Sequence, residues 1–160
     1  MGRTRVWRIL CALAVIWIAG ALWTLGGREA LGFDPVALTR LRTSHEVPVG
    51  TILSGAPLKR ASLHGATLRN VQLDSANLRE ADLSEADLAY AYLGDADLHN
   101  AILRGANLHL ADLDEADLRN ADLTWADLRG ADLTGANLTD ADLSGARLAH
   151  ATMPDGTQHP

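Results

Sequence analysis

A five-residue repeat fills most of this chain. Leucine occupies every fifth position from Leu53 to Leu148, and Met153 extends the series to twenty-one consecutive centres. Alanine stands two residues before each centre from Ala56 to Ala151, with Val71 as the one substitution, and the residue just before the centre is mostly Asp or Asn. The two positions after each centre vary freely. This periodicity restricts the fold more than any other feature of the sequence.

A period of five fits neither an α-helix nor a flat β-strand. In a helix, successive leucines would be separated by about 500° of rotation and would form no single face. In a straight strand, an odd period would place them alternately on opposite faces. A turn repeated every five residues resolves both conflicts, because Leu and Ala can then point inward in every repeat. The pattern predicts a β-solenoid with a Leu and Ala core, in keeping with an aromatic content of only 4%.

The repeated motif Ala-(Asp/Asn)-Leu-x-x resembles the pentapeptide-repeat family over Thr51 to Asp155. This resemblance implies an all-β fold, a right-handed quadrilateral β-helix in which four repeats close each coil. With coils stacked at about 4.8 Å, about five coils would form a rod on the order of 25 Å long. Four faces then run along the rod. Face 1 is centred on Leu53 and on every twentieth residue after it, and faces 2, 3 and 4 are centred on the series that begin at Leu58, Leu63 and Leu68.

Face 1 is acidic and carries no Lys or Arg. We predict a protein-binding surface formed by its acids Asp74, Asp95, Asp112, Asp114, Glu115 and Asp132. Asp112 and Asp132 would stack one coil apart, where like charges about 5 Å apart repel by about 1 kcal/mol in a water-like dielectric. The alternative is a structural role, because a short Asp or Asn side chain before the central Leu can bond to nearby backbone. The other four acids lie outside that position and are more informative.

Three apolar residues form a second candidate, a contact patch across neighbouring faces: Tyr90, Leu110 and Trp125. Tyr90 and Leu110 occupy equivalent positions one coil apart on face 4, whereas Trp125 belongs to face 3, on which Ile102 also points outward. Single exposed aromatic residues are common on protein surfaces, so an ordinary surface is the alternative interpretation.

An apolar segment precedes the repeat. Arg3, Arg5 and Arg8 lead into an uncharged run from Ile9 to Leu25. At helical rise this run spans about 25 Å, the short end of what crosses a bilayer. The arginines before the run favour an N-terminus in the cytoplasm, which would place the repeat domain on the non-cytoplasmic side. We therefore predict a single-pass membrane protein with a signal anchor in residues 1–27.

A cleaved secretory signal peptide is the alternative to the anchor. Ala19-Gly20-Ala21 offers a small-x-small cleavage site, and cleavage there would leave an exported soluble solenoid. The uncleaved anchor is favoured because the apolar run continues beyond this site to Leu25.

Residues 28–50 lack the repeat and form a linker. Asp34 as N-cap and Pro35 at the first helical position predict a short helix. Val36, Leu38 and Leu41 of this helix could cover the open first coil, as the end of a repeat stack requires. The solenoid would then occupy residues 51–155 and a short tail residues 156–160.

Composition and residue placement exclude several functions. A formal net charge of −6 argues against direct nucleic-acid binding. The single cysteine, Cys11, excludes an intramolecular disulfide and a Cys-based metal site. The histidines of the repeat lie on different faces or two coils apart, so they cannot share a metal. We predict no catalytic, cofactor-binding or metal-binding residues and no enzymatic activity, since a convex rod lacks the usual concave pocket.

The sequence predicts a membrane-tethered structural or protein-binding scaffold with an unidentified protein partner. A homodimer, formed by end-to-end or face contact, is a further option. Some members of the pentapeptide-repeat family resemble DNA in size and charge, and they inhibit or protect type II topoisomerases. A DNA-mimicking topoisomerase-binding protein is therefore the alternative hypothesis, although five coils make a short rod and an exported domain would not meet enzymes of the chromosome.

Overall fold

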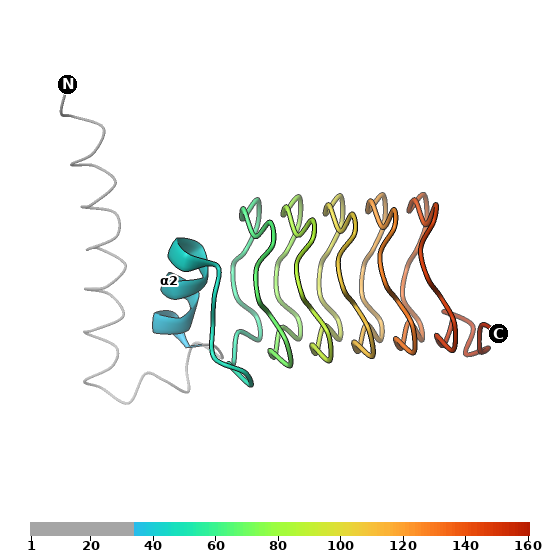
Figure 1. The fold of residues 1–160 in the computed structure, drawn as a ribbon, viewed down its shortest axis with the longest axis horizontal. Coiled ribbons are helices and arrows are strands. Elements are labelled where there is room, and N and C mark those ends of the chain that lie inside the picture. The colour runs from blue at the N-terminus through green and yellow to red at the C-terminus, as the bar shows by residue number, and fades with distance from the viewer. Residues whose placement is uncertain (1–33) are drawn as a thin grey trace, which may run out of the picture.

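The computed structural model describes residues 34–160, which form one helix, α2, followed by a rod of stacked coils (Figure 1). The predicted signal anchor of residues 1–27, its cleavage and its orientation lie outside the described residues. Between residues 34 and 160, no helix has the length and apolar character needed to cross a membrane.

A parallel β-ladder with a register of twenty residues holds the rod together. From Ile52 onward, each parallel bridge joins a residue to the one twenty positions later, from Ile52–Gln72 through to Asp132–Thr152. The Leu53 N–H donates to the Gln72 carbonyl at 2.7 Å, and the Gln72 N–H donates to the Thr51 carbonyl at 2.9 Å. Because each repeat has five residues, four repeats close one coil, as predicted.

Each corner of the coil is a tight turn. The Ala56 N–H donates to the Leu53 carbonyl at 2.9 Å, and the same bond recurs at the following corners. The corner residue, two positions after the central Leu, has a positive φ from Gly55 to His150. A four-residue turn with positive φ at its third residue is of type II, which explains why glycine occurs at several corners.

Where Asp or Asn precedes the central Leu, its side chain binds a backbone amide that the ladder and the turns leave free. For example, the Thr124 N–H donates to Asp122 Oδ1 at 2.9 Å. All twelve Asp and Asn residues at this position accept such a bond from the amide two residues later. The predicted structural role of these residues is confirmed, since an unpaired amide would otherwise cost free energy.

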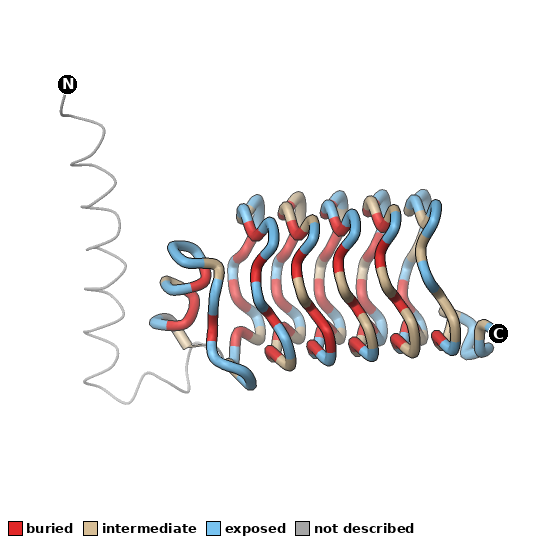
Figure 2. Tube along the Cα trace, in the orientation of Figure 1, coloured by how far each residue is buried: buried red, intermediate tan, exposed pale blue. Residues whose placement is uncertain are grey.

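The core is a column of Leu and Ala inside the coils. Every central leucine from Leu53 to Leu133 is fully buried (Figure 2). No aromatic side chain is buried in the described part of the chain. Full burial of one leucine contributes about 1.5–3 kcal/mol. The repeated leucines therefore supply the apolar burial that aromatic residues provide in many other domains.

Helix α2 spans Pro35–Ser44 and lies against the first coil (Figure 1). Asp34 is its N-cap, and Asp34 Oδ1 accepts the Val36 N–H at 2.9 Å and the Ala37 N–H at 3.3 Å. The predicted helix start is therefore confirmed. The backbone N–H of Asp34 donates to the Ile52 carbonyl at 2.8 Å, which joins the helix to the first coil.

The residues of α2 that cover the coil differ in part from those predicted. Leu38 and Leu41 are buried as expected, and Ala37 is buried with them. Val36 is 54% exposed, so its predicted role in covering the coil is wrong. The helical repeat places residues 37, 38 and 41 on one side, which leaves residue 36 outside.

The last coil is less well covered than the first. Its central residues Leu138, Leu143 and Leu148 are only partly buried. The tail folds back along one side of this coil through an antiparallel bridge between Thr152 and Gln158. The core is therefore closed by α2 at one end and partly closed by the tail at the other.

Candidate protein-binding surface

Face 1 brings the predicted acidic residues together along the rod. Tyr92 forms a parallel bridge with Asp112, and Asp112 forms the next bridge with Asp132. These outward side chains are therefore immediate neighbours in successive coils, at about 4.8 Å spacing. The stacking of Asp112 on Asp132 that the sequence predicted is present.

The remaining four acids lie on the same face, toward the corner that leads into face 2. Asp95, Asp114 and Glu115 are exposed. Asp74 is half-buried, and its Oδ2 accepts a hydrogen bond from the Ser54 hydroxyl at 3.4 Å. The twenty-residue register thus gathers all six predicted acids on one surface.

Two of these acids are also part of the fold. Asp112 Oδ1 accepts the backbone N–H of Asp114 at 3.2 Å. Asp132 Oδ1 accepts both the N–H of Thr134 at 3.0 Å and its hydroxyl at 2.5 Å. Their carboxylates therefore stabilise the turns and offset part of the repulsion between them. Asp95, Asp114 and Glu115 have no such role in turn formation and are better candidates for contact with a partner.

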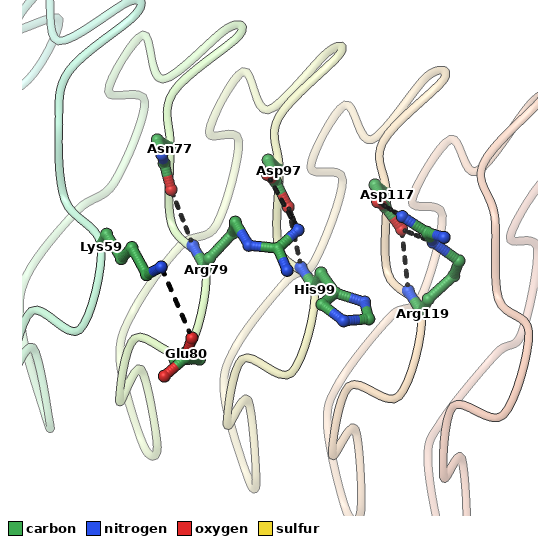
Figure 3. A network of polar contacts seen from close by, with 8 residues as sticks. All are labelled: Lys59, Asn77, Arg79, Glu80, Asp97, His99, Asp117 and Arg119. Carbon is green, nitrogen blue, oxygen red and sulfur yellow. Dashed lines mark hydrogen bonds and ion pairs between the residues drawn. The ribbon is translucent and has the colours of Figure 1, made fainter.

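On face 2, acidic side chains form ion pairs with basic side chains of the same face. Lys59 Nζ lies 3.7 Å from Glu80, and Arg79 lies 3.4 Å from Asp97 in the next coil (Figure 3). Arg119 pairs with Asp117 at 2.6 Å. The hydrogen bond from Arg119 lowers the pKa of the Asp117 carboxyl, against a smaller opposing effect of burial. Acidic and basic side chains are thus mixed and largely paired on this face.

Glu80 on face 2 has a second cation. Arg60 Nε donates to Glu80 Oε2 at 2.6 Å, and this hydrogen bond is the main reason why the pKa of the Glu80 carboxyl is lowered.

Face 4 is compensated in the same way. Arg129 pairs with Asp127 at 2.6 Å, and Arg147 approaches the same carboxylate at 3.3 Å. The Arg129 hydrogen bond lowers the pKa of the Asp127 carboxyl. Arg69 pairs with Asp87 at 3.2 Å.

Face 1 has no such compensation. Within the coils, residues 51–155, Lys and Arg pair with acids of faces 2 and 4 only, and the His64–Glu85 contact on face 3, at 3.9 Å, is an ion pair only when the histidine is protonated. Face 1 also carries no Lys or Arg of its own. Its negative charge is therefore directed to solvent or to a partner, and its potential attracts cations.

Two of the predicted apolar residues lie beside this acidic surface. Tyr90 and Leu110 occupy successive positions at the corner between faces 4 and 1, and both are exposed. The Arg69 guanidinium lies 5.4 Å from the centre of the Tyr90 ring, and the His109 ring meets Tyr90 edge to face at 6.0 Å. The Tyr90 ring is thus held in place from the face 4 side.

Tyr92 was missed by the sequence reasoning and belongs to the same surface. It is 44% exposed on face 1, two residues from Tyr90 and next to Asp112. The repeat itself indicates that Tyr92 is exceptional, because Tyr92 stands where Asp or Asn binds a turn amide in most repeats. A tyrosine there cannot make that bond through a carboxylate or amide oxygen.

Trp125 lies at a different corner, between faces 3 and 4, so face 4 separates it from Tyr90 and Leu110. It is 67% exposed. A Cβ atom at Gly145 would lie 2.7 Å from Trp125 Cε3, so the ring lies close against the backbone of the next coil. The predicted three-residue patch is therefore distributed over two corners.

The histidines of the repeat are placed separately, as their spacing implied. His109 Nδ1 lies 2.8 Å from the Arg129 carbonyl oxygen, and His64 contacts Ser84 on face 3 at 3.2 Å. In the part of the chain that the structure describes, no three His, Cys, Asp or Glu side chains are positioned to hold a metal ion.

Comparison with known proteins identifies the repeat. The family model for pentapeptide repeats matches residues 50–80, 81–120 and 116–154. No curated protein matches the chain.

Two crystal structures of cyanobacterial pentapeptide repeat proteins are similar to the chain. HetL of Nostoc sp. strain PCC 7120, described as involved in heterocyst differentiation regulation, is 36% identical with a TM-score of 0.54; the match covers 71% of this chain and 64% of HetL. Rfr23 of Cyanothece 51142 is 34% identical with a TM-score of 0.58, over 70% of this chain and 92% of Rfr23. The chain therefore belongs to the pentapeptide-repeat family, whose fold is the right-handed β-helix.

Proposed function

We propose that this protein is a membrane-tethered, non-enzymatic scaffold whose solenoid presents face 1 to a protein partner on the non-cytoplasmic side. The contrast between face 1 and faces 2 and 4 is the observation that carries the proposal. Uncompensated carboxylates lie next to exposed tyrosines on face 1, whereas faces 2 and 4 neutralise much of their own charge. An apolar patch bordered by polar groups is typical of a protein-binding surface, and solenoids commonly bind through such extended surfaces.

The membrane part of the proposal rests on the apolar run from Ile9 to Leu25. A topology reporter fused after Pro160 should be active on the non-cytoplasmic side, and N-terminal sequencing of the mature protein should find the segment uncleaved. Cytoplasmic activity of the reporter would contradict the proposed orientation. Sequencing that begins just after Ala21 would instead support the exported soluble form.

The binding part can be tested in the native membrane with a photo-crosslinking amino acid. Placed at position 92 on face 1, it should capture a defined partner; placed at position 102 on face 3, it should not. Tyr92 and Ile102 form a matched pair, because both precede a central Leu in the same coil and are 44% and 42% exposed. Capture from position 102 alone would contradict the proposal.

A DNA-mimicking function has less support from the charge distribution. The acids of faces 2 and 4 are largely paired with arginines, so the rod is not uniformly acidic. A cytoplasmic reporter signal together with inhibition of a type II topoisomerase by the purified chain would favour this alternative.

A further inference from the structure

Coils three and four of face 1 place apolar and acidic side chains directly beside one another. Tyr92 bridges Asp112, and Tyr90 and Leu110 lie at the adjoining corner of the same two coils. Glu115 lies across the face at its other corner. We call Tyr90, Tyr92 and Leu110 the apolar strip. A partner that covers these two coils would therefore contact the apolar strip and the carboxylates of Asp112 and Glu115 at the same time.

The apolar side chains of this strip have no role in the core. Tyr90 and Leu110 are exposed, yet they stand at corners with φ of 61° and 55°. Bulky residues seldom adopt this left-handed conformation, and it costs of order 1–3 kcal/mol in a non-glycine residue. The turn imposes this φ at every corner, and the other corners carry mostly Gly, Asn or charged residues, so apolar side chains at two successive corners beside face 1 are an exception.

The charges on the two sides of the apolar strip differ. On the face 4 side, Arg69 lies over Tyr90 and is itself paired with Asp87. On the face 1 side, Asp114 and Glu115 are exposed, and none of the described ion pairs includes them. A cation in a bound partner would therefore meet paired charges on the first side and unpaired carboxylates that attract it on the second.

We propose that face 1 binds a protein segment that presents a Lys or Arg next to an aliphatic side chain. The aliphatic side chain packs on Tyr92 and Leu110, and the cation lies over Asp114 and Glu115. This inference rests on the proposed function of face 1 as a binding surface and specifies the chemistry of the partner.

Short fluorescein-labelled peptides can test the two halves of this surface separately. The probes are alternating lysine and leucine, alternating lysine and serine, and alternating glutamate and leucine. They are titrated against the full-length chain in nanodiscs of zwitterionic lipid, with empty nanodiscs as the blank, and binding is followed by fluorescence anisotropy. The lysine–leucine peptide should bind tightest, the lysine–serine peptide about tenfold more weakly, and the glutamate–leucine peptide not at all.

Matched variants separate a specific site from general attraction to an acidic protein. Asp114→Asn/Glu115→Gln should weaken binding of the lysine–leucine peptide about tenfold, because two ion pairs are lost. Glu85→Gln/Asp140→Asn removes the same charge from exposed corners of other faces and should change binding less than about twofold.

A second matched pair tests the apolar half. Tyr92→Ser should weaken binding of the lysine–leucine peptide about tenfold and leave the lysine–serine peptide nearly unaffected. Ile102→Ser, at the equivalent exposed position of face 3, should affect neither peptide.

Equal losses in the two charge variants, or equal binding of the two lysine peptides, would overturn the inference. Because the crosslinking experiment does not depend on peptide composition, the two proposals can fail separately. Capture of a partner from position 92 without competition by the lysine–leucine peptide would leave face 1 as the binding surface and reject the chemistry proposed for its partner. Loss of the position 92 crosslink would reject both.

Discussion

Faces 1 and 2 share one interior but differ in the charges they present outside. Both rest on fully buried leucines, as at Leu113 and Leu118, and both form the same ladder and turns. On face 2, Arg119 pairs with Asp117 within one repeat, whereas on face 1 the corresponding Asp112 has Asp114 as its neighbour. The repeat thus determines the inward residues. The outward residues can vary, so the charges of one face are paired within that face, and the charges of another remain available to a partner.

The largest expected effect concerns what the two faces have in common. Leu113→Ala on face 1 and Leu118→Ala on face 2 should each lower the free energy of unfolding by about 2–5 kcal/mol, because each leaves a cavity in a closely packed core. Denaturant unfolding of the two variants should give similar losses. A difference of more than about 2 kcal/mol between them would show that the faces also differ inside the coil.

A smaller effect should separate the faces through their charges. Asp117→Asn keeps an acceptor for the turn amide, as Asn77 and Asn137 show, but it removes the ion pair with Arg119. We expect a loss of up to about 1 kcal/mol near neutral pH. Asp112→Asn removes the same charge where no cation is paired with it, and it should cost less.

The cost of Asp117→Asn should depend on pH. The pKa of the Asp117 carboxyl is lowered in the folded protein from an ordinary value of 3.8, chiefly by the Arg119 hydrogen bond. The ion pair therefore contributes its full stability above that value and loses it as the pH falls through the lower folded pKa. Thermal unfolding from about pH 6 to about pH 3 should show wild type and Asp117→Asn converging in acid. A difference that stays constant would contradict the role of the ion pair.

Most of the fold could be predicted because the repeat encodes it directly. The period identified the inward Leu and Ala, and the family resemblance supplied the coil of four repeats. Val36 was misplaced because an apolar residue in a short helix can face either side, and the packing against the first coil decides between them. Residues 1–27 remain a sequence prediction, since they lie outside the described structure.

The candidate site could be predicted only in part. The twenty-residue register is enough to predict that the six acids share face 1. Whether an acid is neutralised depends on which carboxylate an arginine side chain reaches, as Arg79 reaches Asp97 in the next coil. The sequence predicts that Trp125 and Tyr90 are exposed, which is confirmed, but exposure alone does not bring them together, and they lie at different corners. Tyr92 stands at the Asp/Asn position, where most repeats bind a turn amide, so the freely variable positions alone do not reveal its exposed ring.

The smallest expected effect tests whether Leu110, exposed at the corner between faces 4 and 1, serves the fold. Leu110→Gly should raise the free energy of unfolding slightly, by up to about 1 kcal/mol, because relief of the left-handed strain exceeds the entropy cost of glycine. Asn120→Gly on face 2, at a corner with the same φ of 55°, should gain less, since Asn tolerates this conformation. Denaturant unfolding measures both variants. If Leu110→Gly were clearly destabilising, Leu110 would be needed for packing between coils; if it is neutral or stabilising while peptide binding weakens, Leu110 is retained for its place on the binding surface.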